Sequence, residues 1–247
     1  MSSIGSTRPI RGSQPVPEGA PVVPVSESLS SLRWNQDKCL VEVIDQTLLP
    51  HTLHWIELAD LDDYCHAIRA MQVRGAPLIG ITAAFGLAHA LARDPSTENL
   101  HAASRSLLAT RPTAVNLRWA LDAVIAYVHE LDPAGRADAA LARAQALRTS
   151  DIANCSRIGE HGLQLLRALR SAGTLNIMTH CNAGWLATIE WGTALAPVYK
   201  AHREGIPVHV WVSETRPRNQ GVNLTAWELQ RAGVPCTVVT DSGCGPL

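Results

Sequence analysis

The stretch NIMTHCNAG, residues 176–184, decides how the second half of this chain is expected to fold. It begins as a buried strand and ends abruptly in a polar turn that closes at Gly184. A helix is predicted to follow at once, from Trp185 to about Arg203. In an open α/β sheet, ligands bind at the carboxyl ends of strands, where such turns lie. Cys181 is therefore expected just before a helix N-terminus, where amide dipoles favour the thiolate.

The pattern after Gly173 alternates between strand and helix. Strands are predicted at residues 175–179, 208–212 and 236–240, with helices at 185–203 and 225–232. Gly205 and Gly233 lie just past the helix ends, where glycine is favoured. Short apolar strands joined through helices predict a parallel, Rossmann-like sheet. Such sheets usually have about five or six strands, so we expect the domain to lack its C-terminal half.

The region before Gly173 is predicted to be mostly helical with a small β element. One strand is expected at 39–44, as half of a hairpin, with helices at 61–73, 76–92, 98–109, 117–131, 136–146 and 151–169. Ser150 or Asp151 is a candidate N-cap for the last helix. This α/β chain is thus divided into a disordered tail rich in Ser, Pro and Gly (1–28), a mostly helical N-terminal domain (29–155) and a partial Rossmann-like catalytic domain (156–247).

Composition excludes several classes of partner. A net charge of −1 over 247 residues argues against nucleic acid and acidic membrane surfaces. An anionic ligand must then be held by a few arginines and backbone amides. The six cysteines form no CxxC pair and no apolar signal segment precedes them, so a cytoplasmic protein with free thiols is expected. The longest apolar stretch, 76–92, is expected to fall short of a membrane span and to form a buried helix.

Cys181 is the leading candidate for chemistry. An isolated cysteine is most often a small buried core residue. Here the neighbours Thr179, His180 and Asn182 are polar, and Gly184 permits close approach of the backbone. The residues alone therefore leave both interpretations open, a functional thiol and a core thiol.

Two arginines precede predicted helix starts. Arg74 opens the segment RGAP, residues 74–77, where free helix amides and a guanidinium together suit a phosphate or carboxylate. Arg111 opens RPT, residues 111–113, in which Thr113 is a candidate N-cap. Each segment alone is also compatible with an ordinary turn and a solvated arginine. The two together favour an anionic small-molecule ligand.

Further polar residues follow the predicted strands. The loop 214–221, ETRPRNQG, follows the second strand, so it is either a substrate loop beside Cys181 or a solvated connection. Asp241 follows the third strand as an acid–base candidate or a capping residue, and His180 is a general base or a structural histidine. The sequence has no metal-ligand spacing and no glycine-rich nucleotide motif, so neither a metal nor a nucleotide cofactor is expected.

Four segments occur in one order that resembles a known family. They are RGAP (74–77) with Gly80 and Phe85-Gly86, RPTAVN (111–116), THCNAG (179–184), and ETRP (214–217) continuing through Gln220-Gly221 to LTAWEL (224–229). Together they resemble the S-methyl-5-thioribose-1-phosphate isomerases of methionine salvage, over about residues 32–242. The wider superfamily includes ribose-1,5-bisphosphate isomerases. It also includes regulatory subunits of the translation-initiation exchange factor, which are the chief non-catalytic alternative.

The resemblance implies a cofactor-free conversion of an aldose phosphate to a ketose phosphate by a cytoplasmic homodimer. It implies that Cys181 is the catalytic cysteine. The substrate-binding residues that it implies are Arg74, Gly75 and Ala76 on the phosphate side, with Arg111 and Gln220 elsewhere on the substrate.

The sequence also departs from the family pattern. The family's catalytic aspartate lies in a Gly-Ala-Asp-Arg segment that these 247 residues do not contain, and the downstream Asn-Lys pair is absent as well. Asp241 belongs to an earlier segment and does not replace that aspartate, and Asn223 stands where an arginine is common. Loss of one partner of an acid–base pair costs about 10²- to 10⁴-fold in rate. We therefore expect a C-terminally truncated chain that is inactive or nearly so.

Overall fold

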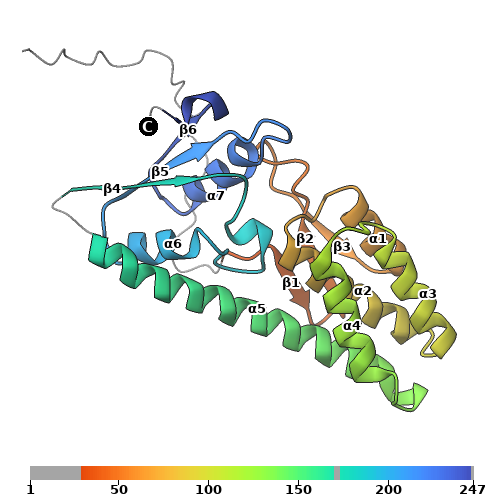
Figure 1. Ribbon diagram of the computed structural model, residues 1–247. Helices are drawn as coiled ribbons and strands as arrows, with labels where there is room; N and C mark the ends of the chain where they lie inside the picture. Colours follow the sequence, from red (N-terminus) through yellow and green to blue (C-terminus); the bar gives the residue numbers. More distant parts are fainter. Residues whose placement is uncertain (1–28, 170–172, 246–247) are drawn as a thin grey trace, which may run out of the picture.

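The computed structural model describes residues 29–169 and 173–245, so the predicted disordered tail, 1–28, lies outside the described residues. The N-terminal part packs helices against a small sheet, and the C-terminal part is built on a second sheet. One long helix, α5, runs alongside both parts (Figure 1). The α/β class predicted from the sequence is confirmed.

The small sheet is antiparallel in the order β1-β2-β3. Its strands are β1 (Leu32–Asn35), β2 (Leu40–Ile44) and β3 (Trp55–Leu58). The strand predicted at 39–44 is thus β2, and its partner in the predicted hairpin is β1. The third strand, β3, was not predicted, because its four residues are too few to show a clear alternation.

Four helices form one core with this sheet: α1 (Leu61–Arg69), α2 (Ala76–Arg93), α3 (Thr97–Leu108) and α4 (Val115–Val128). Helices α1, α3 and α4 each pack against α2. Local sequence sets their starts. Asp60 caps α1 through a reciprocal pair of hydrogen bonds with Asp63, and Ser96 accepts from the amide of Asn99 at 3.2 Å to cap α3. Thr113 is not the N-cap of α4, contrary to prediction, because Ala114 occupies that position without a side-chain bond.

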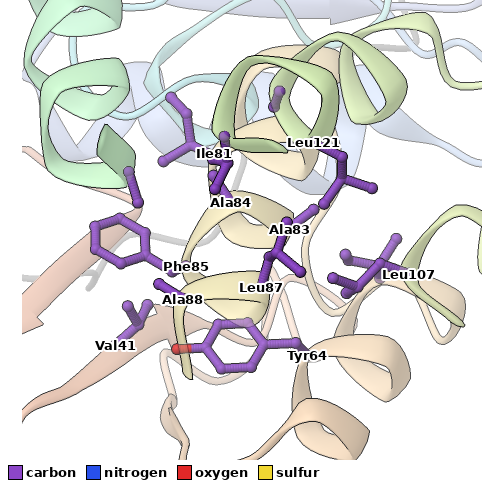
Figure 2. Packing of buried hydrophobic residues seen from close by; sticks show 14 of the residues in the cluster. Val41, Tyr64, Ile81, Ala83, Ala84, Phe85, Leu87, Ala88, Leu107 and Leu121 are labelled. Carbon is purple, nitrogen blue, oxygen red and sulfur yellow. The ribbon is translucent and has the colours of Figure 1, made fainter. Parts of the chain in front are cut away.

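Helix α2 is the centre of the N-terminal core. Every residue from 78 to 88 is buried, and Figure 2 shows its side chains between Tyr64 and Val41 on one side and Leu107 and Leu121 on another. A helix that is apolar all round belongs inside a protein. By length and composition α2 could cross a membrane, so the prediction that it falls short is wrong. Its burial is as predicted, since 72% of it lies inside the fold.

One polar residue of this helix, His89, has a hydrogen-bond partner at each ring nitrogen. Its Nε2 lies 3.0 Å from the carbonyl of Cys39, which can only accept, so Nε2 carries the proton. Its Nδ1, 3.0 Å from the Tyr64 hydroxyl, therefore accepts. This chain of two bonds fastens the β1–β2 hairpin and α1 to the same side of α2.

Helix α5 (Pro133–Leu169) is continuous, whereas the sequence predicted two helices with a cap at Ser150 or Asp151. No glycine or proline interrupts residues 147–151, and the Thr149 hydroxyl bonds within the helix to the carbonyl of Gln145 at 3.0 Å. The first half of α5 adds Ala140 and Ala144 to the core around α2, and Leu163 joins the core of the second sheet. The predicted domain boundary after residue 155 lies inside this helix, and the two-domain division stays a prediction.

The second sheet is parallel in the order β4-β5-β6, as predicted. Its strands are β4 (Leu175–Thr179), β5 (Val208–Ser213) and β6 (Cys236–Val239). Two helices follow the first two strands: α6 (Ala196–Arg203) and α7 (Ala226–Arg231), which continues a π-helical segment, Gly221–Thr225. Gly205 and Gly233 have φ of +73° and +69°, which confirms their predicted places after the helix ends.

The helix predicted over residues 185–203 forms only in its last part. A short 3₁₀ turn, η1 (Trp185–Ala187), stands at its expected start, and α6 begins only at Ala196. The loop between them contains Trp191 and Gly192 with φ of +68° and +77°, values that an α-helix excludes. The argument that a helix dipole favours the Cys181 thiolate is therefore wrong.

The N-terminus of α2 touches the turn that carries Cys181. Gly75, with φ of +90°, is the N-cap of α2, and a Cβ placed there would lie 2.4 Å from the backbone of Ala187. Glycine is required for both reasons, the left-handed backbone and the lack of space. This contact joins the two halves of the protein at the sheet edge where ligands are expected.

Gly75→Ala is expected to lower the free energy of unfolding by about 2 kcal/mol or more, because it combines a positive φ with overpacking. Denaturant titration of the full chain measures this loss. The matched control is Gly135→Ala in the first turn of α5, where a Cβ meets no atom within 4 Å. Equal stability of the two variants would contradict the close contact.

Candidate active site

The backbone of Cys181 is fixed in an unusual conformation. Its φ is +60°, which costs a residue with a side chain roughly 1–3 kcal/mol. Two hydrogen bonds hold it there. The Cys181 amide donates to Oγ1 of Thr215 at 2.8 Å, and its carbonyl accepts from Oγ1 of Thr225 at 2.7 Å. The thiol is half-buried rather than enclosed in the core.

A buried carboxylate lies against the same turn. Glu228 on α7 is 0% exposed, and it accepts hydrogen bonds from Nδ2 of Asn182 at 2.6 Å and from the amide of Leu186 at 3.2 Å. A Cβ at Gly184 would lie 1.9 Å from Oε1 of Glu228. Burial raises the pKa of Glu228 to about 8, and the hydrogen bonds only partly offset this effect. The carboxyl group is therefore mostly neutral at pH 7.

A second carboxylate, Asp241, organises the loop beyond β5. It accepts hydrogen bonds from the Ser213 hydroxyl and from the amides of Thr215 and Arg216, both at 2.9 Å. The bond from Ser213, followed by that from Arg216, lowers the pKa of Asp241. Asp241 thus remains ionised and holds this loop in place, which favours the structural interpretation over the acid–base one.

His180 is oriented through the same serine. Because the Ser213 proton is donated to Asp241, the 2.9 Å contact between Nδ1 of His180 and Oγ of Ser213 has the histidine as donor. This bond orients the exposed ring of His180, which lies beside Cys181 in the chain.

Three side chains lie near Arg74. Burial lowers the pKa of Arg74, the charges of Arg218 and Arg111 lower it further, and Cys181 acts in the opposite direction. Such charge effects fade over roughly 10 Å in salt solution, so Arg218, Arg111 and Cys181 each lie near Arg74. The structure therefore brings together Arg74, Arg111 and Cys181, which the sequence singled out separately. It adds Arg218, whose place in the loop after β5 was the only sequence signal.

A hollow of about 210 Å³ opens beside Arg74. It is lined by Gln46, Thr47, Leu49, Ala70, Met71, Arg74, Arg218, Asn223 and Leu224. Cys181, Arg111 and Gln220 are not among these lining residues, so Arg74 is the residue shared by the hollow and the thiol. Two guanidiniums on one wall, with no acidic residue in the lining, suit an anion.

The remaining predicted residues lie at the same sheet edge. Gly75 and Ala76 begin α2, whose first amides have no side-chain cap and are available to a ligand. Gln220 opens the π-helical segment, and its Oε1 is buried without a hydrogen-bond partner among the described residues. A Cβ at the next residue, Gly221, would lie 1.7 Å from the carbonyl of Ser213, so Gln220 is held close to the end of β5.

Within residues 29–169 and 173–245, no group of three or more His, Cys, Asp or Glu side chains could hold a metal ion. All six cysteines are free. What the site offers chemically is a fixed thiol, an oriented imidazole and a cluster of three guanidiniums. Guanidinium groups bind small anions, and a thiol or an imidazole can transfer a proton.

The fold and this site define an α/β protein of the Initiation factor 2 subunit family. The family model matches residues 72–246, and the chain belongs to this family. Within it, the chain is 58% identical over 219 residues to a methylthioribose-1-phosphate isomerase of Dechloromonas aromatica, covering 88% of this chain and 60% of the relative. A methylthioribose-1-phosphate isomerase of Gluconobacter oxydans is 50% identical, with 86% and 59% covered.

Solved structures agree with this placement. A 5-methylthioribose 1-phosphate isomerase from Pyrococcus horikoshii is 33% identical, with a TM-score of 0.77 over 86% of this chain and 60% of that one. The translation initiation factor eIF-2B, subunit delta, from A. fulgidus is 36% identical, with a TM-score of 0.77 over 89% and 64%. The chain spans about 60% of the length of the curated relatives it matches.

The buried carboxyl group of Glu228 makes stability depend on pH. Its pKa is raised in the folded state, so its stabilising contribution is complete below the ordinary value of 4.5 and is lost as the pH rises to about 8. Each pH unit in this window costs up to about 1.4 kcal/mol. Glu228→Gln is expected to remove this dependence, so the free energy of unfolding of the variant relative to the parent rises between pH 5 and pH 8.

Denaturant titrations at several pH values measure this difference. The matched control is Glu130→Gln, at a side chain that is 85% exposed. A parent and a Glu228→Gln variant with parallel pH profiles would show that Glu228 is not buried in its neutral form.

Proposed function

We propose that this protein interconverts 5-methylthioribose 1-phosphate and 5-methylthioribulose 1-phosphate, the aldose–ketose isomerisation of methionine salvage. The observation that carries the proposal is the grouping of Arg111, Arg218 and Cys181 around Arg74. Its second support is the name that the relatives share, methylthioribose-1-phosphate isomerase.

The arginine cluster suits the phosphate of such a substrate. Three like charges, one of them largely buried, repel one another, and a dianionic phosphate relieves that repulsion. We assign phosphate binding to Arg74 with the first amides of α2, at Gly75 and Ala76. Arg111 and Gln220 contact the rest of the substrate, and the unpartnered Oε1 of Gln220 is an acceptor for a sugar hydroxyl.

The chemistry requires proton handling next to C1. Since C1 carries the phosphate, the sugar ring cannot open to a free aldehyde. The enzyme must therefore move a proton through an enediol-like species or a hydride between C2 and C1, in a pocket that excludes water. Cys181 is the catalytic residue in this scheme, because its half-buried thiol is fixed beside the phosphate-binding arginines.

The same resemblance leads us to propose a homodimer that works in the cytoplasm, without a cofactor, on the parallel sheet of a Rossmann-like domain. A non-catalytic regulatory module and a ribose-1,5-bisphosphate isomerase are the alternatives. The first predicts no turnover, and the second predicts a preference for a substrate with a second phosphate in place of the methylthio group.

The turnover of 5-methylthioribose 1-phosphate by the 247-residue chain is expected to be slow, because the Gly-Ala-Asp-Arg segment is not among its residues. Cys181→Ser is expected to lower this residual turnover by a further factor of about 10² to 10⁴, because a serine hydroxyl is a far weaker acid than a thiol. Substrate affinity should change little, since the arginines remain. Calorimetric binding and an assay of ketose formation on the 247-residue chain separate the two quantities.

The matched control is Cys39→Ser, which changes an exposed free thiol on the β1–β2 hairpin and should leave both quantities unchanged. Turnover that survives Cys181→Ser would remove the catalytic role of the thiol. A parent chain that neither binds nor converts the sugar phosphate would refute the proposed function.

A further inference from the structure

Two side chains at the start of α7, Thr225 and Glu228, form hydrogen bonds with the turn that contains Cys181. Oγ1 of Thr225 donates to the carbonyl of Cys181 at 2.7 Å and accepts from Nδ2 of Asn182 at 3.2 Å. One helical turn later, Glu228 accepts from the same Asn182 amide at 2.6 Å and from the Leu186 amide at 3.2 Å. The residues on both sides of Cys181 are thereby tied to one short element.

The fit around this carboxyl group leaves no free space. Oε1 of Glu228 occupies the space where a side chain at residue 184 would lie. Only glycine fits at this position, because it has no side chain. On the other side, Gly192 packs on Gly184 so closely that a Cβ there would lie 2.3 Å from its carbonyl carbon. The turn is therefore clamped between α7 and the loop that precedes α6.

Packing alone does not explain an ionisable residue here. Burying a carboxyl group costs free energy that an apolar residue of similar volume would not cost. Glu228 accepts hydrogen bonds from Asn182 in the turn and from the Leu186 amide in η1, and Tyr199 of α6 also lies against it. Cys181 holds a φ of +60° that must be maintained by its surroundings. The polarity of residue 228 thus serves the conformation of the turn.

The surroundings keep the group neutral. Tyr199 of α6 is the ionisable side chain that faces it, and burial raises the pKa of the tyrosine, so the tyrosine is neutral as well. Cys236 of β6 acts on Tyr199 in the same direction. These neighbours carry no positive charge, so Glu228 is held by hydrogen bonds rather than by an ion pair.

We propose that Glu228 is the positioning residue of the site: its carboxyl group, through Asn182 and Leu186, directs the Cys181 thiol towards the arginine cluster. It does not touch substrate. The proposal rests on the proposed function only where it assigns that thiol a catalytic role. The direction of the thiol can be tested without turnover.

The test is alkylation of the intact chain by iodoacetamide, with each cysteine followed by mass spectrometry. Glu228→Leu removes both acceptors and is expected to raise the alkylation rate of Cys181 about fivefold or more, because the turn opens locally. Cys155, buried in α5, is the internal control and should stay as unreactive as in the parent. Glu228→Gln keeps one acceptor for Asn182 and should lie between the parent and Glu228→Leu.

Asn182→Ala provides a second variant if Glu228→Leu fails to fold, since it leaves the carboxyl group in place and removes its side-chain donor. It is expected to raise Cys181 alkylation with Cys155 unchanged. An unchanged Cys181 rate would overturn the proposal. A parallel rise at Cys155 would also overturn it, because Glu228 would then stabilise the fold as a whole.

The kinetic constants kcat and KM distinguish a positioning role of Glu228 from a general structural role. In Glu228→Gln, kcat for 5-methylthioribose 1-phosphate should fall about 10- to 100-fold, as expected for a displaced reacting group, while KM stays constant. An equal change in KM would contradict the positioning role. A parent without turnover is the result expected from the absent Gly-Ala-Asp-Arg segment. Binding of the sugar phosphate then decides on the proposed function, and the alkylation result decides on Glu228.

Discussion

The contact between Gly75 and Ala187 is the constraint on which the rest of the site depends. It lets the start of α2 approach the backbone that follows Cys181, with no side chain between them. Because α2 is buried along its length, it cannot shift without disturbing the N-terminal core. The packing of the N-terminal core therefore fixes the position of Arg74, which precedes α2, relative to Cys181. Helix α5, which joins both cores, keeps the two parts in register.

In the site near this contact, guanidinium groups and carboxyl groups have different roles. The charges of Arg111 and Arg218 act on the guanidinium of Arg74, and this repulsion is costly in the free protein and is relieved once an anion binds. The carboxyl groups lie elsewhere and do not compete with that anion. Asp241 is ionised and orders the loop after β5, whereas Glu228 is mostly neutral and supports the Cys181 turn. Acid groups thus shape the backbone, and basic groups face the ligand.

Much of this could be predicted from the sequence, and the failures have physical causes. The parallel strands, the buried α2 and the segments of Arg74, Arg111 and Cys181 follow from apolar runs, β-branched residues and helix-start signals. The break expected within α5 and the helix expected after Cys181 fail because tertiary packing overrides local propensity. The role of Glu228 has no local signal, since its partners lie over 40 positions away in the chain. The grouping of the arginines likewise depends on contacts that only the fold creates.

The most direct test is a crystal structure of the 247-residue chain soaked with 5-methylthioribose 1-phosphate. We predict that the phosphate accepts hydrogen bonds from Arg74 and the first amides of α2, with the sugar carbons C1 and C2 within about 4 Å of the Cys181 sulfur. A phosphate bound away from Arg74, or a thiol that faces the apolar core in the complex, would contradict this account.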